Sequence, residues 1–189
     1  MNFGFRGNDA RISDIGQGEV VSCLANAHFI EKIVDRFGEV IFQKKETEIK
    51  QVIDPRITFI IKDILQEAAR RGTAKKVSTL KRLDLAGKTG TTNEAESTWF
   101  TGFNDYLVTS VWVGFDQPKS LGSREFGSST ALPIWIDYIE SNLKDLPRNR
   151  SIPPEGLVSI KVNKTSGLRS ENGSSNSLFE YFLEEYVPE

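Results

Sequence analysis

The sequence between residues 85 and 115 reads LAGKTGTTNEAESTWFTGFNDYLVTSVWVGF, and three runs within it favour β-strands. These runs, residues 85–92, 99–103 and 107–115, are rich in threonine, aromatic and β-branched residues. Asn104-Asp105 is a turn signal, so the last two runs should pair antiparallel. The third run is apolar on both faces, which predicts burial on both sides. We therefore expect an α/β (α+β) fold in which helices cover both faces of an antiparallel sheet.

Two helices flank these strands in the sequence. Residues 54–72 carry apolar side chains at helical spacing, with Asp54 as the N-cap and Pro55 at the first helical position. Gly72 is suited to a left-handed C-cap. Residues 132–144 should form a closing helix, because Trp135 and its apolar neighbours lie on one stripe. These helices are the expected cover of the sheet.

The remaining segments suggest three regions. Residues 1–28 are a fragmentary N-terminal segment, and 29–146 hold the main strands and helices. Residues 147–189 are a C-terminal extension that starts with a Pro- and Arg-rich stretch. A β-hairpin is expected at 29–42, where Asp35 to Gly38 fits a type I turn. Residues 157–162 read as a strand, and the low-complexity tract 169–177 reads as mobile.

Composition excludes several function classes. The 189 residues carry 24 Lys and Arg against 26 Asp and Glu, so a net charge of −2 offers no general attraction for nucleic acid. No apolar run approaches the ~18 residues of a membrane span, and the N-terminus does not resemble a signal peptide. One cysteine excludes an internal disulfide, and one histidine beside it does not make a usual zinc site. We therefore expect no metal and no cofactor.

The sequence Lys88-Thr89-Gly90-Thr91 is the sharpest chemical feature. An edge strand can pair with an extended peptide, and an ammonium beside hydroxyls suits a carboxylate. This favours a strand that docks a peptide and holds its terminal carboxylate. The competing interpretation is a surface strand with a solvated lysine. A phosphate-binding loop is rejected, because position 82 is arginine where that motif requires glycine.

The surroundings of this tetrapeptide resemble the transpeptidase domain of class A penicillin-binding proteins. The resemblance covers most of residues 29–187 and, more loosely, 3–20. The C-terminal part of the chain is similar to the segment that follows this domain in Gram-negative members of the family. It is carried by ordered blocks: 29–42, 71–74, 84–97, 99–104, 111–116, 131–136, 154–158 and 180–184.

The resemblance implies a serine D,D-transpeptidase that cross-links peptidoglycan stem peptides and is acylated by β-lactams. Three motifs form that site: Ser-x-x-Lys, Ser-x-Asn and Lys-Thr-Gly. Lys88-Thr89-Gly90 matches the third. By resemblance, Lys88 and the Thr91 hydroxyl would hold the substrate carboxylate, and the Thr91 N–H would supply one oxyanion donor. The implied substrate-binding residues are therefore Lys88, Thr89, Gly90 and Thr91.

The first two motifs have no convincing match. Ser78 and Ser141 fit Ser-x-x-Lys in letters, but one lies in a polar connector and the other near the end of a helix. Ser174-Ser175-Asn176 fits Ser-x-Asn within the low-complexity tract. We therefore expect the nucleophile and its lysine outside this chain, and the chain to be inactive by itself.

The family context implies further partners and a location. The expected partner is the N-terminal half of the transpeptidase domain, and the family's glycosyltransferase domain and membrane anchor would also lie outside this chain. Location at the periplasmic face of the inner membrane follows from resemblance alone, with membrane contact only through that anchor. The segment between residues 20 and 29 is also about a dozen residues shorter than the family pattern. The alternative is a non-catalytic peptide-binding module or a structural half of a larger enzyme.

Overall fold

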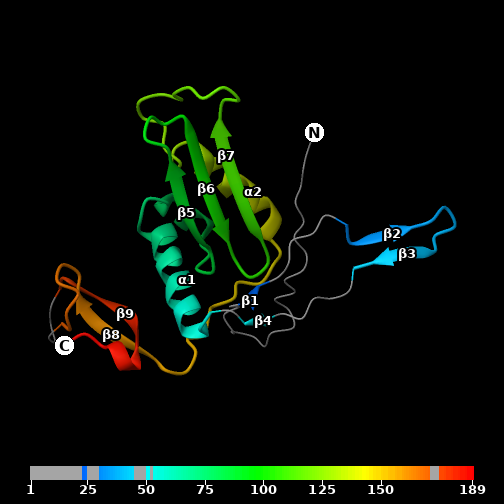
Figure 1. Cartoon of the computed structure of the whole chain (residues 1–189). Coiled ribbons are helices and arrows are strands. Elements are labelled where there is room, and N and C mark those ends of the chain that lie inside the picture. The colour runs from blue at the N-terminus through cyan, green and yellow to red at the C-terminus, as the bar shows by residue number, and fades with distance from the viewer. Residues whose placement is uncertain (1–22, 25–29, 45–49, 52, 171–174) are drawn as a thin grey trace.

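The computed structural model describes residues 23–24, 30–44, 50–51, 53–170 and 175–189 (Figure 1). Its two α-helices are α1 (Pro55–Arg70) and α2 (Ala131–Leu143), with 3₁₀ helices η2 (Lys75–Leu80) and η3 (Glu184–Tyr186). The mixture of helices and antiparallel strands confirms the predicted fold class. Most of the predicted segment 1–28 lies outside the described residues.

The central sheet has three antiparallel strands, β5 (Ala86–Thr91), β6 (Ser97–Phe103) and β7 (Val108–Gly114), in the order β5-β6-β7. All three predicted strands are confirmed. The register places Lys88 opposite Thr101, and Thr101 opposite Ser110. Because side chains alternate along a strand, these three residues share one face of the sheet with Trp99 and its cross-strand partner Trp112. We call this the Lys88 face.

The opposite face of the sheet carries the hydrophobic core. Phe100 on β6 stacks edge-on against Trp135 of α2, with ring centroids 4.8 Å apart, and both side chains are fully buried. The indole N–H of Trp135 donates to the backbone oxygen of Thr109 at 3.2 Å. The predicted closing helix is thus confirmed, and it packs on the sheet through its apolar stripe.

The Lys88 face departs from the sequence-based expectation. Trp112 is 43% exposed and Val108 is 70% exposed, so burial of β7 on both faces is wrong for the described residues. Within that part of the chain, helical cover is seen on the Phe100 face, where α2 packs. The prediction failed because aromatic and β-branched residues favour strands both in protein interiors and on exposed sheet faces.

Helix α1 begins as predicted but ends differently. The Asp54 carboxylate accepts the Arg56 N–H at 2.8 Å, and Pro55 follows it at the first position. The C-cap is Arg71 with φ −128°, so the proposed left-handed cap at Gly72 is wrong. Gly72 is required for space, because a Cβ there would lie 2.8 Å from the Ala68 oxygen.

The N-terminal strands lie apart from the central sheet (Figure 1). The predicted hairpin is confirmed as β2 (Lys32–Val34) and β3 (Val40–Gln43), and a second small pair joins β1 (Cys23–Leu24) to β4 (Lys50–Gln51). The Asp35 carboxylate accepts the N–H groups of Phe37 and Glu39, each at 2.8 Å. The Gly38 N–H donates to the Asp35 oxygen, as a type I turn requires.

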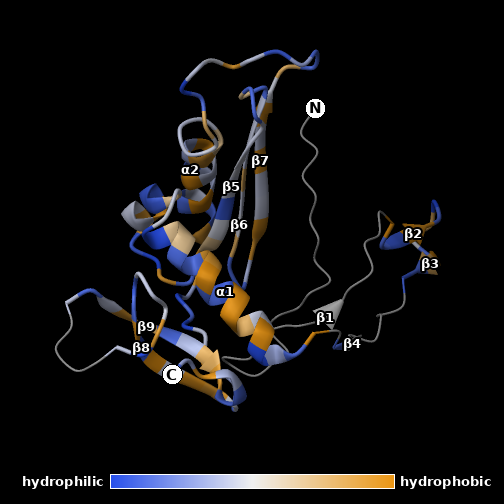
Figure 2. Cartoon of the chain, turned by 60° about the vertical axis from the view of Figure 1, so that its left-hand side comes forward, coloured by the Kyte–Doolittle hydropathy of each residue, from blue (hydrophilic) through white to orange (hydrophobic). Residues whose placement is uncertain are grey.

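The C-terminal residues form a separate two-stranded antiparallel sheet from β8 (Leu157–Asn163) and β9 (Ser177–Leu183). Figure 2 shows hydrophobic residues along both α1 and this hairpin. Phe59 of α1 meets Tyr181 edge-on with centroids 4.9 Å apart, and Arg56 pairs with Glu185 at 3.0 Å. The predicted strand at 157–162 is confirmed. Part of the tract predicted to be mobile, residues 171–174, lies outside the described residues, whereas Ser177 already belongs to β9.

Candidate functional site

The four residues singled out in the sequence lie consecutively on β5. Among the described strands, β5 pairs only with β6 and therefore forms an edge of the central sheet. Lys88 is exposed, whereas Thr89 and Gly90 are half-buried. Alternation places Lys88 on one face of the strand and Thr89 and Thr91 on the other. A ligand that lies along the β5 edge can therefore be approached by the side chains of Lys88, Thr89 and Thr91.

The Lys88 ammonium lies over this edge. Its Nζ donates to the backbone oxygen of Thr89 at 3.0 Å and lies 3.5 Å from the Thr89 hydroxyl. It forms no ion pair with any residue in the described ranges. An exposed cation without a neighbouring carboxylate raises the local positive potential, which favours an anionic ligand.

Thr89 is joined to a residue that the sequence analysis did not assign to the site. Its hydroxyl lies 2.9 Å from the hydroxyl of Thr73, which follows α1. Either hydroxyl can be the donor, so one of the two protons remains available to a third group. Lys88, Thr89 and Thr73 therefore gather three polar groups at the β5 edge. The sequence contained Thr73 only as part of the family-like block 71–74, with no spacing rule that links it to Thr89.

Thr91 is held by the segment that leads into α2. Its hydroxyl accepts the Gly127 N–H at 3.1 Å, and the hydroxyl proton remains free to be donated. Gly127 packs so closely that a Cβ there would lie 2.4 Å from the Trp99 oxygen and 2.8 Å from the Gly90 oxygen. Only glycine fits this contact. Gly127 was not predicted, because nothing in its loop distinguishes it from the other glycines.

A buried ionic network fixes the start of β5. The Asp84 carboxylate accepts from Arg82 through Nη2 at 2.7 Å and Nε at 3.1 Å, and from the Asn104 amide at 3.1 Å. Arg82 also donates to the backbone oxygens of Leu143, Leu146 and Pro147. Arg82 and Asp84 are both buried. This network links the strand that carries Lys88 to the β6–β7 turn and to the end of α2.

The two serines that match Ser-x-x-Lys in letters are engaged with the backbone. Ser78 lies in η2 and donates to the Lys75 oxygen at 2.6 Å, and Ser141 donates to the Asp137 oxygen at 3.0 Å. Both are exposed. Ser174, which begins the Ser-x-Asn match, lies outside the described residues. Neither hydroxyl contacts a side-chain base within the described residues.

The described residues offer neither a metal site nor a membrane-spanning helix. No group of three or more His, Cys, Asp and Glu side chains has the arrangement of a metal site there. No helix in the same ranges combines the length and apolar character needed to cross a bilayer.

Comparison with known proteins resolves the family. Residues 2–137 match the family described as penicillin binding protein transpeptidase domain. The chain belongs to this family. Penicillin-binding protein 1A of Pseudomonas aeruginosa is 46% identical over 142 residues, which is 75% of this chain and 17% of that protein. Penicillin-binding protein 1A of Neisseria gonorrhoeae is 39% identical over 178 residues, which is 83% of this chain and 22% of that protein.

Solved structures of penicillin-binding proteins agree. The crystal structure of penicillin-binding protein 1A from Haemophilus influenzae matches with a TM-score of 0.78 and 31% identity, over 90% of this chain and 31% of that one. PonA1 from Mycobacterium tuberculosis matches with a TM-score of 0.58 and 26% identity, over 72% and 38%. This chain therefore spans roughly a fifth of the length of the curated relatives it matches. The resemblance expected from the sequence blocks is confirmed.

Proposed function

We propose that the protein containing this chain cross-links peptidoglycan stem peptides by serine D,D-transpeptidation and is acylated by β-lactams. The observation that carries this proposal is the placement of Lys88-Thr89-Gly90-Thr91 on an edge strand within a transpeptidase-family fold. A non-catalytic peptide-binding module is not favoured, because the family match extends far beyond this tetrapeptide. The chain supplies the substrate-docking strand in this account.

The carboxylate of the stem peptide or β-lactam would dock at the β5 edge. Lys88 contributes an ammonium that no described carboxylate neutralises, and Thr89 and Thr91 contribute hydroxyls. The substrate backbone would run alongside β5, as an added strand does in β-augmentation. Gly90 leaves room for that approach because it has no side chain.

Acyl transfer would then use a serine outside this chain. Its oxygen would attack the stem-peptide carbonyl, the amide C–N bond would break, and the departing amine would take up a proton. The Thr91 N–H would donate to the developing oxyanion. A second stem peptide's amine would then attack the serine ester, form the cross-link and release the serine. The chain by itself would not complete this cycle.

The wider organisation follows the same family. We assign residues 1–28 to a fragmentary N-terminal segment of the transpeptidase domain and residues 29–146 to the C-terminal part of that domain. Residues 147–189 form an extension that follows it. The separate β8–β9 sheet and the end of the family match at residue 137 support that last boundary. The complete protein would also carry the other half of the transpeptidase domain, a glycosyltransferase domain and a membrane anchor. It would work at the periplasmic face of the inner membrane.

Amide NMR of the ¹⁵N-labelled chain tests the docking role directly. A stem-peptide analogue with a free terminal carboxylate should shift the amides of residues 88–91, whereas its C-terminal amide should not. Lys88→Met should abolish these shifts, and Lys144→Met, an exposed lysine at the end of α2, should leave them unchanged. Equal shifts with the free acid and the amide would refute carboxylate docking.

A further inference from the structure

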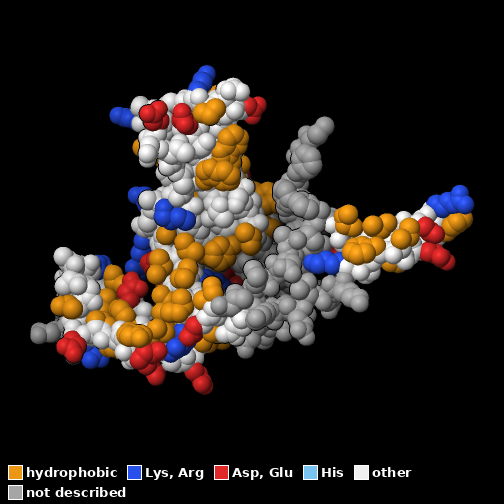
Figure 3. All heavy atoms as spheres, in the orientation of Figure 1, with side chains coloured by type: hydrophobic (Ala, Val, Ile, Leu, Met, Phe, Trp, Pro, Cys, Tyr) orange, Lys and Arg blue, Asp and Glu red, His pale blue; other side chains and the backbone are white. Residues whose placement is uncertain are grey.

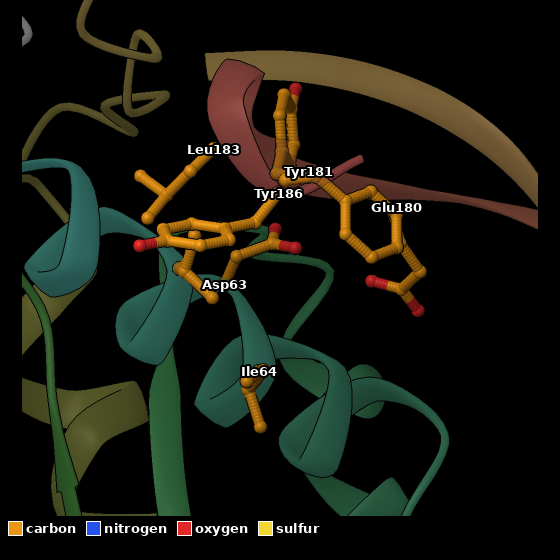
Figure 4. Close-up of a pocket in the computed structure, with 8 residues that line it drawn as sticks. Asp63, Ile64, Glu180, Tyr181, Leu183 and Tyr186 are labelled. Carbon is orange, nitrogen blue, oxygen red and sulfur yellow. The ribbon is translucent and has the colours of Figure 1, made fainter. Parts of the chain in front are cut away.

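An apolar cavity lies between helix α1 and the C-terminal segment. It has a volume of about 510 Å³. Its lining residues come from α1, β9 and η3: Ile60, Asp63, Ile64, Glu180, Tyr181, Phe182, Leu183 and Tyr186. Figure 4 shows Asp63 and Ile64 on the helix, and Glu180, Tyr181, Leu183 and Tyr186 on the neighbouring C-terminal segment. This volume is within the range of ligand-binding pockets.

The cavity continues into an exposed apolar stripe. Ile57, Ile61 and Ile64 follow one another at helical spacing on α1, and they are 36%, 50% and 56% exposed. Figure 3 shows hydrophobic side chains gathered over α1 and beside the C-terminal hairpin. Ile64 belongs to both the stripe and the cavity lining, so the stripe adjoins the cavity. We call the cavity and the stripe together the α1–β9 groove. Apolar side chains spread along a helix beside a cavity suit a peptide segment better than a compact small molecule.

Two carboxylates in the groove lack an ion-paired partner among the described residues. Neither Asp63 nor Glu180 accepts a side-chain hydrogen bond or forms an ion pair within the described ranges. The nearby cations are engaged elsewhere: Arg70 and Arg71 both pair with Glu67, and Arg56 pairs with Asp54 and Glu185. A partly buried carboxylate without a partner is costly, so a cation that enters the groove would be bound favourably.

The electrostatic surroundings agree with this. Burial raises the pKa of the Asp63 carboxyl above its ordinary value; Glu67 adds to the effect and Arg70 opposes it. Burial also raises the pKa of Glu180, with Asp63 and Glu67 adding and Arg71 opposing. Tyr181 and Tyr186 are the other titratable groups that line the groove. The groove therefore combines apolar walls with unsatisfied negative charge.

We propose that the α1–β9 groove binds a basic, apolar peptide segment of a partner protein, in which aliphatic or aromatic side chains alternate with lysine or arginine. The apolar side chains would fill the cavity and cover the isoleucine stripe. The cations would pair with Asp63 and Glu180. This docking function is independent of transpeptidation, since none of its residues belongs to the Lys88 site.

Fluorescence anisotropy with a defined peptide tests the proposal. The probe is a fluorescein-labelled peptide in which lysine alternates with leucine and phenylalanine, and its matched control has glutamate in place of lysine. The lysine peptide should bind saturably, whereas the glutamate peptide should not. Asp63→Asn and Glu180→Gln should each weaken binding about fivefold, as expected for a partly exposed charge pair.

Three comparisons keep the proposal falsifiable. Ile64→Ser should also weaken binding, and its exposure leaves the core intact. Glu140→Gln, an exposed carboxylate on α2, should bind like the unmodified chain, with urea midpoints confirming that every variant folds. Equal binding of both peptides, or an equal loss in Glu140→Gln, would overturn the proposal. It would also be overturned if binding vanished in a chain extended to the length of its relatives, because another part of the polypeptide would then fill the groove.

Discussion

Replacing Asp84 with alanine should destabilise the chain by about 3 kcal/mol. The Asp84 carboxylate accepts two hydrogen bonds from Arg82 and one from Asn104, and it is 3% exposed. The substitution leaves a guanidinium that is 7% exposed without its counter-ion. Removing one partner of a buried ion pair costs about 3–5 kcal/mol. The lower end applies here, because Arg82 keeps its bonds to three backbone oxygens.

Urea denaturation followed by tryptophan fluorescence measures this loss, with the free energy obtained by linear extrapolation. Asp137→Ala is the matched control, since that side chain is exposed on α2 and should cost less than about 0.5 kcal/mol. The double variant Arg82→Met/Asp84→Leu should recover part of the loss, because apolar replacement removes both buried charges. A loss below about 1 kcal/mol for Asp84→Ala would refute the claim that this network anchors β5.

Two further substitutions probe other parts of the structure. Gly127→Ala should destabilise the chain by about 1–3 kcal/mol in the same urea assay, because the new methyl group would meet the backbone of Gly90 and Trp99; the exposed control Ser123→Ala should be neutral, and equal stability of both variants would contradict the close packing. Asp63→Asn should make the chain more stable at pH 7 than the unmodified protein. Burial raises the folded-state pKa of Asp63, so its ionised form costs stability at neutral pH, and this cost disappears as the pH falls below the ordinary carboxyl pKa. The stabilisation by Asp63→Asn should therefore shrink toward zero near pH 3, and an advantage that does not change with pH would argue against this assignment.

The sequence predicted the parts of the fold that depend on local patterns. Enrichment in threonine, aromatic and β-branched residues located β5, β6 and β7, and helical spacing with Asp54 and Pro55 located α1. It did not predict that Trp112 is exposed, because burial depends on which surfaces meet in three dimensions. Nor did it assign a strand to the acidic and aromatic end of the chain, where β9 pairs with β8 across a low-complexity tract.

The sequence also predicted only some of the residues of the candidate site. Lys88 and its three neighbours stood out because their residue types suit a carboxylate. Thr73 and Gly127 did not, although each contacts a site threonine. Their contributions rest on long-range contacts across the fold, a hydroxyl pair in one case and a close backbone approach in the other. Neither contact produces a residue spacing that a single sequence could reveal.

Penicillin labelling with peptide mapping tests the central claim most directly. A chain extended to the length of its relatives would be treated with fluorescent penicillin, digested and analysed by mass spectrometry, beside its Lys88→Met and Lys144→Met variants. We predict a single serine adduct outside these 189 residues, slower labelling of Lys88→Met, and unchanged labelling of Lys144→Met. An adduct on Ser78, Ser141 or any other serine of this chain, or an unchanged rate for Lys88→Met, would contradict the account.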